Sequence, residues 1–251
     1  MSECPPVSRH FILSVLAVAI YLPLLLLADS PGLGPQIALG AATAGFLWLM
    51  TRRGTVDRRQ IIIAIIIAGT GECILSLGWG LYSYRNALIP LYVFFGHGVF
   101  YALAAESANQ RTLQRLAPSI TRGVLLTGSV IAICSLVFFN DTWGLVWWLI
   151  AATLLVRSKN PLLLAACFIY TMPLEWVGTA IGNWVWAADV PYVGLTSANP
   201  PSGVGVLYIL LDLITVLVAS RRFDFESLVM GRPFLAPFAP RGEDRAGVQS
   251  Q

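Results

Sequence analysis

The sequence predicts an all-α membrane protein, a bundle of about eight transmembrane helices with both termini on the cytoplasmic side. First, 57% of its 251 residues are hydrophobic and only 12% are charged, whereas a soluble domain has about 45–50% and about 25%. Second, the apolar residues form segments about as long as a bilayer requires. Third, nearly all of the basic residues lie at the two termini or in every second loop between these segments. This composition excludes a soluble globule, a disordered chain and a disulfide-stapled secreted module.

Eight apolar segments are expected to cross the membrane in turn. They are residues 11–28, 34–51, 61–82, 87–105, 123–140, 143–156, 161–182 and 203–219. The first could be mistaken for a signal peptide, but its apolar run exceeds a normal h-region and Asp29-Ser30-Pro31 is not a small-residue cleavage site. The sixth is short and rich in tryptophan, so its ends are the least defined.

The basic residues predict how the segments are oriented. With a cytoplasmic N-terminus, fifteen of the sixteen Lys and Arg residues fall on the inner side, and Arg85 alone lies in an outer loop. The sequence therefore predicts a multi-pass protein of the cell membrane with its N- and C-termini inside. The tail 223–251 mixes Pro, Gly, Arg and acids, and is expected to be a cytoplasmic extension with little structure.

Two passages of the chain resemble each other. In each, an acid in a segment is followed by Gly-x-aromatic-x-aromatic and then by Pro. The first has Glu72, Gly80, Tyr82, Tyr84 and Pro90, and the second has Glu175, Gly182, Trp184, Trp186 and Pro191, each 101 to 103 residues later. Each half contains four segments, and after an even number of crossings the chain is back on the side of the membrane where it started. Both halves then have the same orientation, so we interpret 1–110 and 111–222 as parallel four-helix repeats.

Three acids lie deep within the expected segments, namely Glu72, Glu175 and Asp212. A charged acid at a helix centre costs about 2.5–3.5 kcal/mol on insertion scales, and no segment contains Lys or Arg. The acids are therefore expected to be protonated or to face a polar cavity. His97, between two glycines, is expected at a similar depth, as either a catalytic group or a hydrogen-bonded core histidine. These four residues are the catalytic candidates.

Aromatic residues are expected at the outer interface, where they form either an ordinary membrane belt or the mouth of a cavity. In a cavity, rings could hold a polyene or stabilise a carbocation. The substrate-binding candidates are Tyr82, Tyr84, Trp184, Trp186, Trp79, Trp176, Asn183, Asn199, Tyr101 and Tyr208. The outer loop, residues 187–202, is expected to cap the cavity, and Arg85 to pair with Asp189 or with an anionic headgroup.

The composition favours no cofactor. Two histidines and four cysteines without ligand spacing predict no metal site. Neither a Walker A motif nor GxGxxG is present, and a net charge of +3 is too small to indicate nucleic acid. The expected partners are membrane lipids and a lipophilic small-molecule substrate that arrives from the bilayer.

The acid followed by Gly-x-aromatic-x-aromatic and Pro resembles a pattern of integral-membrane carotenoid biosynthesis proteins. These are the hydratases of the bisanhydrobacterioruberin hydratase type and the duplicated lycopene cyclase domain, and small membrane terpene cyclases are similar. The resemblance covers 72–101 and 173–212. It implies a cofactor-independent enzyme that protonates an alkene of an isoprenoid or polyene lipid, leading to cyclisation or hydration.

Two other functions remain open at this point. A small transporter or lipid-binding protein could use a midplane acidic site, with the acids coupled to protons. A non-catalytic membrane subunit could recruit a partner through its Arg-rich inner loops, although topology already explains those arginines.

Overall fold

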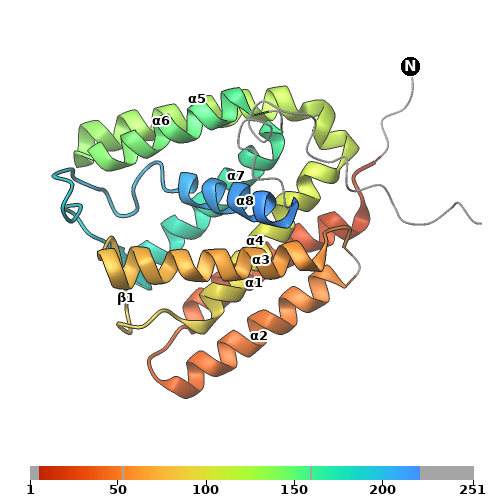
Figure 1. Ribbon diagram of the computed structural model, residues 1–251, viewed down its shortest axis with the longest axis horizontal. Helices are drawn as coiled ribbons and strands as arrows, with labels where there is room; N and C mark the ends of the chain where they lie inside the picture. The colour runs from red at the N-terminus through yellow and green to blue at the C-terminus, as the bar shows by residue number, and fades with distance from the viewer. Residues whose placement is uncertain (1–5, 53, 159, 221–251) are drawn as a thin grey trace, which may run out of the picture.

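The computed structural model describes residues 6–52, 54–158 and 160–220, and within them the predicted eight helices are confirmed (Figure 1). The α-helices are α1 (Arg9–Ala28), α2 (Leu33–Thr51), α3 (Arg58–Glu72), α4 (Leu91–Asn109), α5 (Arg111–Phe139), α6 (Thr142–Arg157), α7 (Pro161–Ala180) and α8 (Gly205–Ser220). A π-helix (Cys73–Trp79) continues α3, and two short strands are β1 (Tyr82–Tyr84) and β2 (Trp184–Trp186).

Five helices are long and apolar enough to cross a membrane: α1, α2, α3 with its π-helical end, α5 and α7. Helices α6 and α8 are apolar but have only 16 residues each, which is about 24 Å at 1.5 Å per residue. Crossing by α4, α6 and α8, and the orientation of the bundle, remain predictions. The expected tail 223–251 lies outside the described residues.

The surface of the bundle is apolar. On α1, Leu13, Ile20 and Leu27 are 64–69% exposed, and on α5 Val137 and Phe138 are 68% and 75% exposed. A water-soluble protein rarely exposes such a continuous apolar surface, so these side chains are suited to contact lipid. The exposed surface therefore supports a multi-pass membrane protein.

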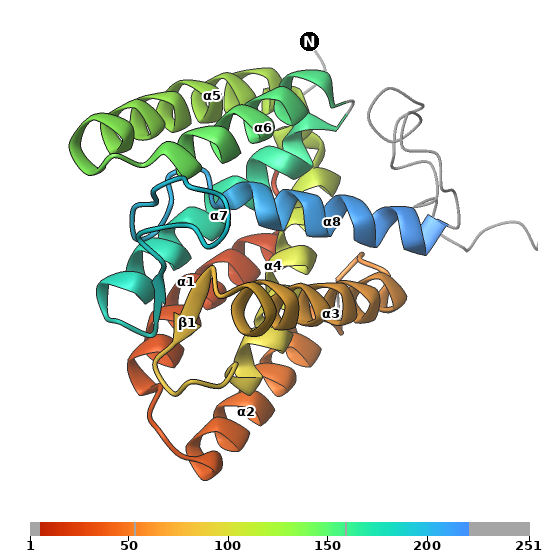
Figure 2. The ribbon, with the colours of Figure 1, turned by 60° about the vertical axis from the view of Figure 1, so that its left-hand side comes forward.

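Helix α4 is the central element of the bundle. Residues 96–108 are buried on every side, as expected of a helix enclosed by others. It packs against α1, α2, α3, α5 and α7, and both ribbon views place it in the middle (Figures 1 and 2). Because α3 packs on α8 and α4 packs on α7, the two halves of the chain share one core.

Strands β1 and β2 form an antiparallel ribbon that the sequence did not predict. Tyr82 pairs with Trp186, and Tyr84 pairs with Trp184. The predicted segments 61–82 and 161–182 were therefore too long, since the helices end at Trp79 and Ala180. Gly80 and Gly182 have φ of 77° and 74°, the left-handed conformation in which glycine commonly ends a helix.

Two further helices begin elsewhere than predicted. Helix α5 was expected from residue 123 but starts at Arg111, because Arg111, Arg115 and Arg122 lie exposed on one face of a helix instead of in a loop. Helix α4 was expected from residue 87 but starts after Pro90, which occupies its N-cap position. The ribbon and the outer loop lie at the end of the bundle opposite the start of α1 (Figure 1).

Candidate functional site

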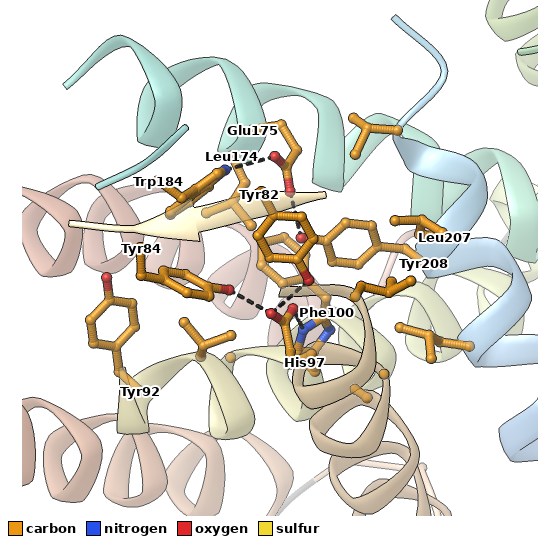
Figure 3. A pocket seen from close by; sticks show the side chains of 18 of the residues that line it. Tyr82, Tyr84, Tyr92, His97, Phe100, Leu174, Glu175, Trp184, Leu207 and Tyr208 are labelled. Atoms are coloured by element: carbon orange, nitrogen blue, oxygen red, sulfur yellow. Dashed lines mark hydrogen bonds and ion pairs between the residues drawn. The ribbon is translucent and has the colours of Figure 1, made fainter. Parts of the chain in front are cut away.

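A cavity of about 140 Å³ lies beneath the ribbon. Its walls come from α1, α3, α4, α7, α8 and both strands, and we call it the acid chamber (Figure 3). Eight of the predicted site residues line it: Glu72, Tyr82, Tyr84, His97, Glu175, Trp184, Trp186 and Tyr208. Most of the remaining lining is apolar, so the carboxyl groups are the chemically distinctive part of the chamber.

Glu72 is the last residue of α3, where the backbone changes to the π-helix. Its Oε2 accepts hydrogen bonds from the hydroxyls of Tyr82 at 2.8 Å and Tyr84 at 2.7 Å. Its Oε1 lies 3.0 Å from Nε2 of His97. π-Helical turns occur frequently at functional sites, and this one directly follows the acid.

Glu175 lies in the last turns of α7 and is 4% exposed. Its Oε2 accepts from the indole N–H of Trp184 at 2.9 Å and of Trp186 at 3.2 Å. Its Oε1 is 2.8 Å from the hydroxyl of Tyr208. Indole N–H groups only donate, so a proton on a neutral Glu175 sits on Oε1, the oxygen beside Tyr208.

The two acids have equivalent settings. Each accepts hydrogen bonds from two ring residues of the strand that follows it, and the antiparallel pairing places both strands over one chamber. A parallel duplication predicts this equivalence. The third partners differ between the two acids. The sequence similarity continues from Gly98-Val99-Phe100-Tyr101 to Gly205-Val206-Leu207-Tyr208, so Tyr208 corresponds to Tyr101 and not to His97.

Aromatic contacts connect the two acid clusters. Tyr82 and Trp186 have ring centroids 4.5 Å apart, and His97 stacks on Tyr208 at 5.2 Å with 30° between the planes. Burial and the adjacent Glu72 carboxyl raise the pKa of Tyr82 and Tyr84 above the ordinary value. Both phenols therefore stay neutral at physiological pH and remain hydrogen-bond donors.

The structure does not bring Asp212 into the chamber. Asp212 and Thr215 line a separate cavity of about 10 Å³ together with Cys167, and His97 lies between this cavity and the chamber. Oδ2 of Asp212 and the Thr215 hydroxyl are buried and have no hydrogen-bond partner within the part of the chain that the structure describes. A space of this size holds at most about one water.

Three of the predicted aromatic contacts also lie outside the chamber. Trp176 is 45% exposed and points away from the core. Tyr101 donates to Oε1 of Gln60 at 3.0 Å, towards the start of α3. Trp79 donates to the carbonyl of Pro191 at 2.9 Å, and so ties the π-helix to the outer loop.

The predicted asparagines hold the backbone around the chamber and do not line it. Asn183 donates to the carbonyl of Leu26 at 2.9 Å and joins the end of α7 to α1. Oδ1 of Asn199 accepts from the N–H of Trp186 at 3.0 Å, on the edge of the ribbon. Both side chains position the walls that carry the rings.

Arg85 does not pair with Asp189, contrary to one of the expectations from the sequence. Its guanidinium donates to the carbonyls of Asp29, Ile181 and Gly182. Basic side chains commonly satisfy the free carbonyls at a helix C-terminus, and here the carbonyls that follow α7 take that role. Arg85 therefore fixes the end of the helix that carries Glu175.

Asp141 is a structural residue that the sequence interpretation missed. It is 0% exposed, caps α6 by accepting from the N–H of Gly144 at 3.0 Å, and also accepts from the N–H groups of Ala198 at 2.9 Å and Ser202 at 2.7 Å. It thereby fastens the outer loop to the bundle. Its position just before an apolar helix was a detectable capping signal.

Among the described residues, no three His, Cys, Asp or Glu side chains gather closely enough to hold a metal ion. The sequence matches no protein-family model, and no curated protein or solved structure shows significant similarity to it. The protein is helical, with several helices long and apolar enough to cross a membrane, and two of its buried carboxyl groups, those of Glu72 and Glu175, face a ring-lined chamber.

Proposed function

We propose that this protein is an integral-membrane, cofactor-independent enzyme that protonates a carbon–carbon double bond of an isoprenoid or polyene lipid. One observation carries the proposal. Two buried carboxyl groups with different hydrogen-bond partners face the same small, ring-lined chamber. Paired carboxyls in different environments can divide the roles of acid and base.

Glu175 is the proton donor in this proposal. The proton on Oε1 passes to one alkene carbon, the π electrons form the new C–H bond, and the other carbon becomes a cation. The carboxylate left behind keeps its hydrogen bonds from the indoles of Trp184 and Trp186. Hydrogen bonds to a charged acceptor are stronger than those to a neutral one, so the product of proton transfer is stabilised.

Glu72 and His97 form the opposite side of the proposed site. Their 3.0 Å contact places a carboxylate–imidazole pair where it can stabilise the cation and accept a proton. The rings of Tyr82, Tyr84 and Trp186 line the space between the acids and add cation–π attraction. The cation is resolved in one of three ways. Loss of a proton from a neighbouring carbon gives an isomer, and addition of water gives an alcohol and releases a proton. Alternatively, the π electrons of a second double bond in the same chain attack the cation, which closes a ring and forms a new cation that then loses a proton.

Deuterium transfer in D₂O tests this proposal whatever product the reaction gives. Purified protein in nanodiscs is incubated with geraniol, geranylgeraniol, squalene or phytoene, and deuterium in the recovered lipid is measured by mass spectrometry. Reversible protonation leaves deuterium on carbon even where no net reaction occurs.

The variants are Glu175→Gln, Glu72→Gln and the control Glu106→Gln, a buried acid outside the chamber. We expect Glu175→Gln to lower incorporation by about 100-fold or more, the usual contribution of a general acid, while Glu106→Gln retains it. A protein that binds these lipids but incorporates no deuterium would contradict the proposal and favour a transporter or lipid-binding protein.

A further inference from the structure

A second cavity of about 260 Å³ lies between α1, α4 and α7 and adjoins the acid chamber. We call it the lateral groove. Apart from Tyr170, every residue that lines it is apolar, and the Tyr170 hydroxyl is already bonded to Ser107 at 2.8 Å. The groove therefore offers an occupant apolar contact and almost no free polar group.

The groove is open to the outside of the bundle and shares four lining residues with the chamber. Ile169 and Val177 on its wall are 44% and 38% exposed, so it faces the surface that contacts lipid. At its inner side, Leu22, Leu26, Phe100 and Leu174 line both the groove and the chamber. Leu174 directly precedes Glu175, and Figure 3 shows the two side by side.

Each of the two outer walls carries a proline. Pro23 of α1 and Pro173 of α7 both line the groove. Proline inside a helix removes one backbone hydrogen bond and disturbs the turn before it. Ala19 and Ile169, the residues whose carbonyls lose that partner, also line the groove. Backbone hydrogen bonding is therefore interrupted in both helices that line the groove.

The geometry points to the lateral groove as the binding site for the chain of a linear isoprenoid lipid, whose reacting double bond lies in the acid chamber. This inference rests on the proposed function. The chamber alone is too small for a long polyene, so most of such a substrate must lie elsewhere. The lining of α1 from Val15 to Leu26 spans about 16 Å at 1.5 Å per residue, which gives an extended chain an apolar surface leading to Glu175.

Chain length provides the test, with native mass spectrometry of bound geranylgeraniol, geraniol and hexadecanol as the readout. Ala19→Trp fills the groove from α1, and Val177→Trp fills it from α7 as an independent second variant. Ala17→Trp is the matched control, since Ala17 is exposed on the same helix but lines neither the groove nor the acid chamber.

We expect either groove variant to weaken geranylgeraniol binding by about tenfold or more, and geraniol binding by no more than about twofold. Ala17→Trp should change neither, and straight-chain hexadecanol should bind the wild type more weakly than geranylgeraniol. Equal losses for both prenols, unchanged geranylgeraniol binding in both groove variants, equally tight hexadecanol, or no binding of either prenol to the wild type would each overturn the inference.

These binding results are separate from those that test the chemistry. If chain length governs binding as expected but no deuterium reaches the lipid, the proposed reaction fails and the groove stands. If deuterium reaches geranylgeraniol equally well in the groove variants, the groove fails and the reaction stands.

Discussion

Replacement of Asp141 should release the outer loop that holds the ribbon over the chamber. Its carboxylate accepts three backbone N–H groups, from Gly144, Ala198 and Ser202, while itself fully buried. A hydrogen bond to a charged group contributes about 1.5–3 kcal/mol. Water entering at the outer surface replaces part of the loss, so we expect Asp141→Ala to destabilise the protein by about 3–5 kcal/mol.

Asp141→Asn should keep two of these hydrogen bonds and remove the third. The amide oxygen can keep the two bonds made by Oδ1, but the NH₂ group then faces the N–H of Ser202 across 2.7 Å, which is a contact between two donors. We expect a loss of about 1.5–3 kcal/mol, and at about 2–4 °C per kcal/mol for a chain of this size the unfolding temperature falls by roughly 3–12 °C.

Thermal unfolding in nanodiscs and amide hydrogen exchange measure both effects. The amides of Ala198 and Ser202 should exchange faster in both variants, and fastest in Asp141→Ala. Asp189→Ala in the same loop is the control, because that side chain is exposed and exposed substitutions usually change stability by about 0.5 kcal/mol or less. An Asp141→Ala protein that unfolds within about 1 °C of the wild type would refute this reasoning.

Three further predictions concern the chamber. Gly178→Ala places a methyl group 2.0 Å from the ring of Trp184, so the ring must move off Glu175, and deuterium incorporation should fall by about tenfold or more. Asp212→Asn should leave incorporation within about twofold of the wild type, since Asp212 lies outside the chamber. The raised pKa values of Tyr82 and Tyr84 predict that neither ionises near the ordinary value of 10.0 in the folded protein. Because the unfolded chain loses these protons above that pH and the folded chain keeps them, stability should decline as the pH rises past 10.0, as ultraviolet titration and unfolding at alkaline pH can measure.

Each of these predictions would be contradicted by a specific result. Gly123→Ala is the control for Gly178→Ala, because nothing lies within 4 Å of the added methyl group; equal effects of the two changes would contradict the ring contact. A complete loss of incorporation in Asp212→Asn would place that acid in the reaction. Two tyrosines that ionise at their ordinary pKa would show that the chamber is open to water.

The long apolar runs predicted the helices well, because a membrane helix must be apolar over most of its length. The acids were equally conspicuous, since Glu72 and Glu175 interrupt such runs without a basic partner. The four rings that follow them were also predicted as a group, from the Gly-x-aromatic-x-aromatic spacing, as the possible mouth of a cavity and not as hydrogen-bond donors to the acids.

The sequence could not supply the rotation of each helix or the pairing of the ribbon. Asp212 was expected at the depth of the other acids, but depth along a helix axis does not say which side of His97 a side chain occupies. A strand of three residues is too short for a period-two signal, so the pairing of Tyr82 with Trp186 was not foreseen. The same holds for Trp176, because its place beside Glu175 in the sequence does not show that its side chain is on the exposed side of α7.

The most direct test of the proposed chemistry compares deuterium incorporation in wild type and Glu175→Gln at equal occupancy of geranylgeraniol, with occupancy fixed by native mass spectrometry. Equal occupancy separates the loss of the proton donor from any loss of binding. If Glu175 is the donor, the variant holds the lipid but incorporates deuterium at least about 100-fold more slowly. Incorporation at the wild-type rate in the Glu175→Gln protein would contradict that role.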